Sequence, residues 1–163
     1  TKVRSSQLSC HPQVLVISHE FAKEILTDSK LGMKMEILKS FSTNPYVCFS
    51  DYARTELEVF EFEGCVELKF SNQNDEVFES HQFHGKGVDI FGVFQIVNSQ
   101  WVKNTEKIHS IHSCYDPRYW SKIKHYLLKV KDYEFSCLAK SISRKEYSCS
   151  TKEFVKDLVD QIW

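Results

Sequence analysis

Two short histidine pairs are the residues in this sequence best suited to bind a metal ion. They are His81 with His84 and His109 with His112, and Cys114 follows the second pair. Neutral imidazoles and a thiolate suit zinc, and two such pairs on neighbouring strands could meet around one ion. In an extended strand, however, residues three apart point to opposite faces, so each pair needs a bulge to reach one ion. A zinc-binding domain or a metal-assisted hydrolase is therefore an alternative hypothesis, and hydrogen-bonded or exposed histidines are the simpler interpretation.

Nucleophilic catalysis has weaker support in the sequence. Cys114 follows His112 by two residues, but this spacing does not place the imidazole on the thiol, and no third orienting group is evident. A Gly-x-Ser-x-Gly elbow, a Walker-type phosphate loop and a dinucleotide glycine fingerprint are all absent from the sequence. We therefore expect no cofactor apart from the zinc alternative, and a binding protein rather than an enzyme.

A row of basic residues marks a candidate partner-binding surface. Asp116 and Pro117 form a helix start, an N-cap followed by proline, and predict a helix near 117–131. A row of cations along that helix is favourable only beside an anionic partner, such as an acidic protein, nucleic-acid phosphates or the chain's own acidic segment. A solvated helix face is the alternative. The row is Arg118, Lys122, His125 and Lys129, flanked by Lys124 and Lys131.

Charge is divided unevenly along the chain. Residues 1–81 hold 8 Lys/Arg and 13 Asp/Glu, whereas residues 82–163 hold 13 and 9, so balances of −5 and +4 add to the net −1. Residues 56–79 carry eight acids against Lys69 alone. Such opposite surfaces can steer a charged partner or each other. The acids of 56–79 are also explained simply as the solvent face of a strand ribbon.

Aromatic residues are concentrated in the strand-rich part of the sequence. They could fill a dense core, which is the default, or line a cavity for an apolar ligand under a curved sheet. These residues are Phe60, Phe62, Phe70, Phe78, Phe83, Phe91, Phe94 and Trp101.

Hydrophobic periodicity predicts the elements that must position these residues. An apolar, β-branched run at 14–17 predicts a strand, and Ser18 is a plausible cap for helices within 18–28 and 31–41. Alternation predicts strands at 57–62 and 66–70, joined by a hairpin turn at Glu63-Gly64 and with a bulge near Val59–Phe60. Further strands are predicted at 88–97, 107–114 and 135–139, and a capping box at Ser150–Glu153 predicts a helix near 151–162.

Composition bounds the kind of protein. A chain of 163 residues with 42% hydrophobic and 26% charged residues is typical of one folded domain. No apolar run is long enough to span a membrane. The six cysteines are unevenly spaced and no Asn-x-Ser/Thr site is present, which favours reduced thiols in an intracellular protein, either nuclear or cytoplasmic. Because the chain does not begin with Met, excision from a larger protein is an open alternative.

These observations combine into one prediction. The chain is a single α+β domain over 1–163, with an N-terminal strand and helices, a curved, mainly antiparallel sheet, a basic helix and a C-terminal helix. Its predicted function is that of a non-enzymatic interaction module, a scaffold or adaptor, which binds an acidic protein through the basic helix or a sheet edge. A zinc site, nucleic-acid binding and apolar-ligand binding are the alternatives, and no membrane contact is expected.

Overall fold

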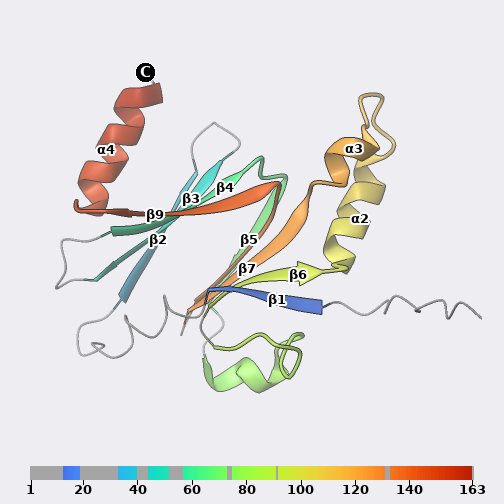
Figure 1. Ribbon diagram of the computed structural model, residues 1–163, viewed down its shortest axis with the longest axis horizontal. Helices are drawn as coiled ribbons and strands as arrows, with labels where there is room; N and C mark the ends of the chain where they lie inside the picture. The colour runs from blue at the N-terminus through green and yellow to red at the C-terminus, as the bar shows by residue number, and fades with distance from the viewer. Residues whose placement is uncertain are drawn as a thin grey trace, which may run out of the picture.

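Two antiparallel sheets form the body of the molecule (Figure 1). The structure is a computed structural model, and it describes residues 13–18, 33–39, 44–51, 57–72, 75–90, 92–130 and 133–162. Within these residues, one sheet has five strands in the order β1-β6-β7-β8-β5, and the other has four in the order β2-β3-β4-β9. Three α-helices and a short 3-10 helix accompany them, so the predicted α+β class is confirmed at this level.

The elements have the following bounds. The five-stranded sheet contains β1 (Gln13–Ser18), β6 (Gly92–Val97), β7 (Lys124–Val130), β8 (Tyr133–Ala139) and β5 (Glu67–Ser71). The four-stranded sheet contains β2 (Met33–Lys39), β3 (Pro45–Asp51), β4 (Leu57–Glu63) and β9 (Ser141–Tyr147). The helices are η1 (Asp75–Ser80), α2 (Gln100–His109), α3 (Pro117–Trp120) and α4 (Thr151–Ile162).

The main core lies between the two sheets. Phe62 on β4 is fully buried, and its ring centroid lies 5.0 Å from that of Phe135 on β8 and 6.0 Å from that of Tyr126 on β7. Because side chains alternate along a strand, every second residue of β4 and β8 enters this layer. The buried residues of this core are Val47, Phe60, Phe62, Val93, Tyr126, Leu128, Phe135, Cys137 and Ala139.

The chain passes between the sheets at a bend, where a hairpin was predicted. β4 pairs with β9, while β5 pairs with β8, so β4 and β5 belong to different sheets and do not form a hairpin. Gly64 occupies the bend with φ of +63°, a conformation that favours glycine. The Lys140 amide donates to Glu63 O at 2.9 Å and the Val66 amide to Leu138 O at 2.8 Å, so backbone hydrogen bonds hold both sides of the bend.

The outer face of the five-stranded sheet is covered by two separate pieces of chain. One is the segment 75–90, which contains η1 and packs Phe83 and Val88 against Phe94 and Leu127. The other is formed by α2 and α3, whose tryptophans pack near Leu138. In Figure 1, η1 and these two helices lie at different margins of the sheet. The sheet surface between the two covers holds the cavity described below.

Helix α4 contacts the outer face of the four-stranded sheet through Phe154 and Leu158. Phe154 is buried with Cys48, Leu57 and Val59. The predicted capping box is confirmed, because the Ser150 amide donates to Glu153 Oε2 at 2.8 Å and the Glu153 amide donates to Ser150 Oγ at 3.3 Å. No helix among the described residues is long and apolar enough to cross a membrane.

Other local predictions require correction. Met33–Lys39 is strand β2 and not part of the helix predicted within 31–41. Apolar residues at the alternate positions Met33, Met35 and Ile37 fit a strand as well as a helix. The predicted strand at 107–114 is wrong because α2 extends to His109, and β4 runs in continuous register without the predicted bulge. The strands predicted near 14–17 and 135–139 are confirmed as β1 and β8. The helix predicted after Ser18 falls outside the described residues.

Candidate functional site

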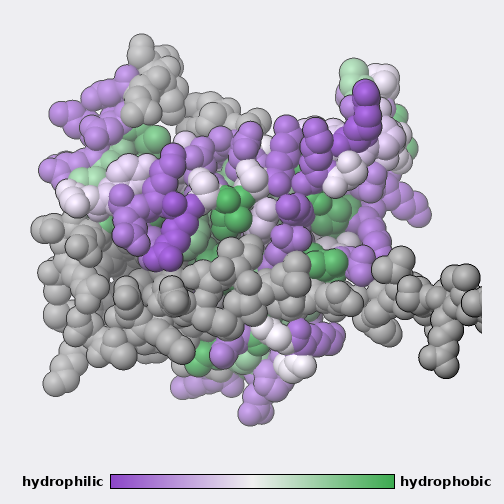
Figure 2. Space-filling model, in the orientation of Figure 1, coloured by the Kyte–Doolittle hydropathy of each residue, from purple (hydrophilic) through white to green (hydrophobic). Residues whose placement is uncertain are grey.

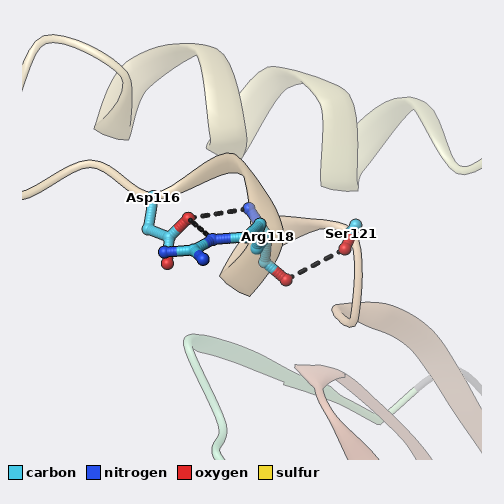
Figure 3. A network of polar contacts seen from close by, with 3 residues as sticks. All are labelled: Asp116, Arg118 and Ser121. Atoms are coloured by element: carbon cyan, nitrogen blue, oxygen red, sulfur yellow. Dashed lines mark hydrogen bonds and ion pairs between the residues drawn. The ribbon is translucent and has the colours of Figure 1, made fainter.

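The predicted basic helix over 117–131 is wrong. Asp116 caps α3 as expected, with its Oδ1 accepting the Arg118 amide at 2.9 Å, but the helix ends at Trp120 (Figure 3). The chain then forms β7, where Tyr126 and Leu128 face the core and Leu127 faces the opposite side. Because both faces of this central strand are covered, its apolar residues run together and imitate a helical spacing.

The basic residues assigned to that helix are dispersed. Arg118 is exposed, and its Nε donates to Asp116 Oδ1 at 3.2 Å, so its charge is paired locally (Figure 3). Lys122 and Lys124 are exposed in the turn and at the start of β7, whereas His125 and Lys129 are 4% and 1% exposed. The sixth residue of the set, Lys131, lies outside the described part of the chain. No common basic stripe is formed by the five that are described.

The acidic segment and the basic C-terminal half meet in the four-stranded sheet. Arg144 on β9 forms an ion pair with Glu58 on β4, and Lys145 Nζ lies 4.0 Å from Glu61 Oε2. Part of the charge division seen in the sequence is thus satisfied within the fold. On the face shown in Figure 2, the described hydrophobic residues form separate patches among hydrophilic ones.

A cavity of about 480 Å³ lies on the outer face of the five-stranded sheet. Its floor comes from side chains of β5, β7 and β8, and its walls come from the segment after η1 and from the start of α2. A cavity of this volume is in the range that holds a small organic molecule. The lining residues are Lys69, Phe70, Ser71, Gln82, Phe83, Ser99, Gln100, Trp101, His125, Glu134 and Ser136.

His125 is the most unusual residue of this cavity. It is 4% exposed, and its Nδ1 lies 2.9 Å from Ser99 Oγ. Its other ring nitrogen, Nε2, is buried and has no hydrogen-bond partner among the described residues. Burial and, to a smaller extent, the Lys69 ammonium lower the pKa of His125 from 6.5 to about 4, and Glu134 opposes this shift. The imidazole is therefore neutral near pH 7.

The hydrogen bonds of Ser99 are compatible with a proton on Nε2 of His125. Ser99 is the N-cap of α2, and its Oγ accepts the Val102 amide at 3.4 Å. With that oxygen acting as the helix cap, its hydroxyl proton is available to Nδ1 of His125. The ring proton then resides on Nε2. In this arrangement the N–H donor of His125 is buried beside the cavity and unused among the described residues.

Trp101 positions the polar groups around His125. Its indole Nε1 donates to Glu67 Oε2 at 2.8 Å, which fixes the ring above β5. Lys69 Nζ lies 4.0 Å from the Trp101 ring centroid, a cation–π arrangement, and the Trp101 ring meets that of His125 edge-on at 5.0 Å. A cation, an aromatic surface and a buried N–H donor are therefore adjacent.

The acid of the cavity lining lies close to a histidine. Glu134 Oε2 lies 2.8 Å from His81 Nε2. The other ring nitrogen of His81, Nδ1, accepts the Phe83 amide at 3.2 Å. The contact between His81 and Glu134 links the segment after η1 to β8. Lys69 lies on the neighbouring strand close to this acid, because Lys69 pairs with Ser136 and Ser71 pairs with Glu134.

The five residues predicted as metal ligands are not gathered at one point. His81 contacts Glu134, and the ring of His84 meets Phe78 edge-on at 5.2 Å. His109, His112 and Cys114 line a second, more open cavity of about 460 Å³ near Trp120. Within the described ranges, no three His, Cys, Asp or Glu side chains are arranged so that they could hold one metal ion.

Analysis of the sequence missed most of the cavity. Phe70, Phe83 and Trp101 were predicted as potential cavity residues, but His125 was predicted on an exposed helix, and no role was predicted for Ser99, Glu134 or Ser136. A signal was present for His125, because a polar residue just before the apolar run at 126–128 is also compatible with a central strand. No protein-family model, curated protein or solved structure matches the chain, so the site must be argued from its own geometry.

Proposed function

We propose that this protein is a non-enzymatic binding domain that holds a small organic carboxylate in the cavity above β5, β7 and β8. The observation that carries the proposal is the Nε2 atom of His125, which is buried at the cavity and has no partner among the described residues. A buried donor left unsatisfied costs about 1–3 kcal/mol. A ligand that accepts from this atom removes that cost.

The lining favours an organic ligand over water alone. Trp101 and Phe83 flank His125, with ring centroids 5.0 and 6.1 Å from the imidazole. Ordered water requires two to four polar partners, whereas aromatic walls offer apolar surface that a flat or apolar body can cover. The ligand therefore has an apolar or aromatic body.

The charges favour a carboxylate as the polar end. Lys69 supplies a cation at the cavity, and a neutral His125 supplies an N–H donor. Both groups favour a ligand with a hydrogen-bond acceptor, and the Lys69 charge favours an anionic one. Glu134 would repel a carboxylate, and its contact with His81 Nε2 at 2.8 Å lowers this repulsion without removing the charge. Ser136 adds a hydroxyl on the sheet floor.

The Ser99–His125 pair supports binding rather than nucleophilic catalysis. Ser99 is 6% exposed and its Oγ caps helix α2, which explains its position without a chemical role. In a nucleophile–base pair, a third group orients the imidazole from its second nitrogen. Within the described residues, Nε2 of His125 has no such group.

The test compares matched acids and amides. We expect benzoate, phenylacetate or indole-3-acetate to bind the full chain, measured by isothermal titration calorimetry, and the corresponding amides to bind more weakly. Lys69→Met should weaken acid binding about tenfold, the effect of losing roughly 1.4 kcal/mol, and leave amide binding unchanged. Lys103→Met, on the exposed side of α2, is the charge-matched control. Equal binding of acids and amides, or equal loss in both variants, would refute the carboxylate assignment.

A second candidate function keeps the prediction of a protein docked at a sheet edge. Among the described strands, β5 pairs with β8 alone, and Phe70 on it is 46% exposed and stacks on Tyr133 at 5.9 Å. An added strand would satisfy the backbone groups at this edge. Protein isolated with its bound partners should then show slower amide exchange at 67–71 than the purified chain. Equal exchange rates would argue against docking there.

A further inference from the structure

Two cysteine sulfurs meet where the chain passes between the sheets. Cys65 lies in the bend between β4 and β5, and Cys137 lies on β8 with its side chain in the main core. Their Sγ atoms are 3.1 Å apart, with Cys137 donating to Cys65. Both are thiols in this structure, and a disulfide bond of about 2.05 Å requires them to approach by only about 1 Å.

The backbone around this pair is held in register on both sides. Leu68 is the Cα partner of Cys137 in the β5–β8 ladder, and the Val66 amide donates to Leu138 O at 2.8 Å. The sulfurs are therefore brought together by strand pairing and not by mobile side chains alone. A disulfide between them demands no change of strand register.

We propose that Cys65 and Cys137 form an oxidation site. A hydroperoxide oxidises the two thiols to an intramolecular disulfide. Cys65 reacts first because it is partly exposed, whereas Cys137 is 0% exposed. The Cys65 thiolate attacks a peroxide oxygen and the O–O bond breaks, which leaves a sulfenic acid and releases water or an alcohol. Cys137 loses its proton and attacks the Cys65 sulfur, the S–O bond breaks, and water leaves. Two thiols and one hydrogen peroxide thus give one disulfide and two waters.

This disulfide would close a long loop that contains the cavity. The two cysteines are 72 residues apart, and the segment between them carries β5, η1, β6, α2 and β7. Closing a loop of this length restricts the unfolded chain and raises the folding equilibrium constant on the order of 10³-fold in the chain-entropy treatment. Oxidised protein should therefore unfold at a higher urea concentration than reduced protein.

The experiment treats the reduced full chain with hydrogen peroxide, blocks the remaining thiols and digests it with trypsin without reduction. Mass spectrometry should find the peptide 55–69 joined to the peptide 132–140 with loss of two hydrogens. Cys65→Ser and Cys137→Ala should each abolish this species, while Cys114→Ser, which removes an exposed thiol, should leave it intact.

The same digest contains the results that would overturn the proposal. These are Cys65 converted to sulfinic acid with Cys137 still reduced, or linkage of either cysteine to Cys48, Cys114 or Cys149. A product found only between two chains on a non-reducing gel would also overturn it. The urea midpoint of the peroxide-treated Cys65→Ser variant serves as the baseline, because that variant cannot form the link.

Discussion

Replacement of His125 by Asn should reduce the dependence of stability on pH. In the native state, burial and the Lys69 ammonium together lower the pKa of this imidazole from 6.5 to about 4, against the opposing charge of Glu134. The unfolded chain therefore takes up a proton on His125 below pH 6.5, whereas the folded chain does so only near pH 4. Stability falls as the pH drops through this window, because the unfolded state binds more protons there.

The expected magnitude follows from the two pKa values. A gap of about 2.5 units corresponds to roughly 3 kcal/mol when the pH is below both values, and about 2 kcal/mol of this is lost between about pH 7.5 and pH 5. The wild-type free energy of unfolding should therefore fall by about 2 kcal/mol more than that of His125→Asn over this range. Other groups that face the imidazole, Lys69 and Glu134, are present in both proteins.

Urea denaturation followed by tryptophan fluorescence at a series of pH values measures this difference. The absolute stability of His125→Asn does not decide the matter, because only the slope against pH reports the titration. His84→Asn, which removes an exposed imidazole, is the matched control. Parallel pH profiles for wild type and His125→Asn would refute the claim that the ring is buried and neutral.

Two further predictions concern local structure and are measured by urea denaturation. Ser150→Ala removes the hydroxyl that accepts the Glu153 amide, and we expect the free energy of unfolding to fall by about 1 kcal/mol. An unchanged urea midpoint would count against the capping box. Gly64→Ala and Gly85→Ala each place a Cβ on a residue of positive φ, +63° and +71°, which costs about 1 kcal/mol. Gly64→Ala should lower the free energy of unfolding more than Gly85→Ala does, because its Cβ would lie 2.9 Å from the Lys140 side chain, whereas nothing lies within 4 Å of a Cβ at Gly85. Equal losses of stability in the two variants would contradict this.

The sequence by itself determined the features that depend on neighbours along the chain. The capping box at Ser150 and Glu153 fixes the start of α4, because both of its hydrogen bonds join residues three apart. Asp116 and Pro117 likewise fix the start of α3, and alternation identifies β8, which is buried along most of its length. These signals are local, so no knowledge of distant strands was needed.

Only the tertiary structure decided how far α3 extends and which elements form the cavity. At 124–130 the apolar residues fit a helix as well as a strand, and pairing with β6 and β8 selects the strand because it buries both faces. That choice moves His125 from a predicted surface into the sheet, next to Ser99 and Trp101 at the start of α2 and near Lys69 from β5. Residues this far apart in sequence meet only through the strand order, which local periodicity does not encode.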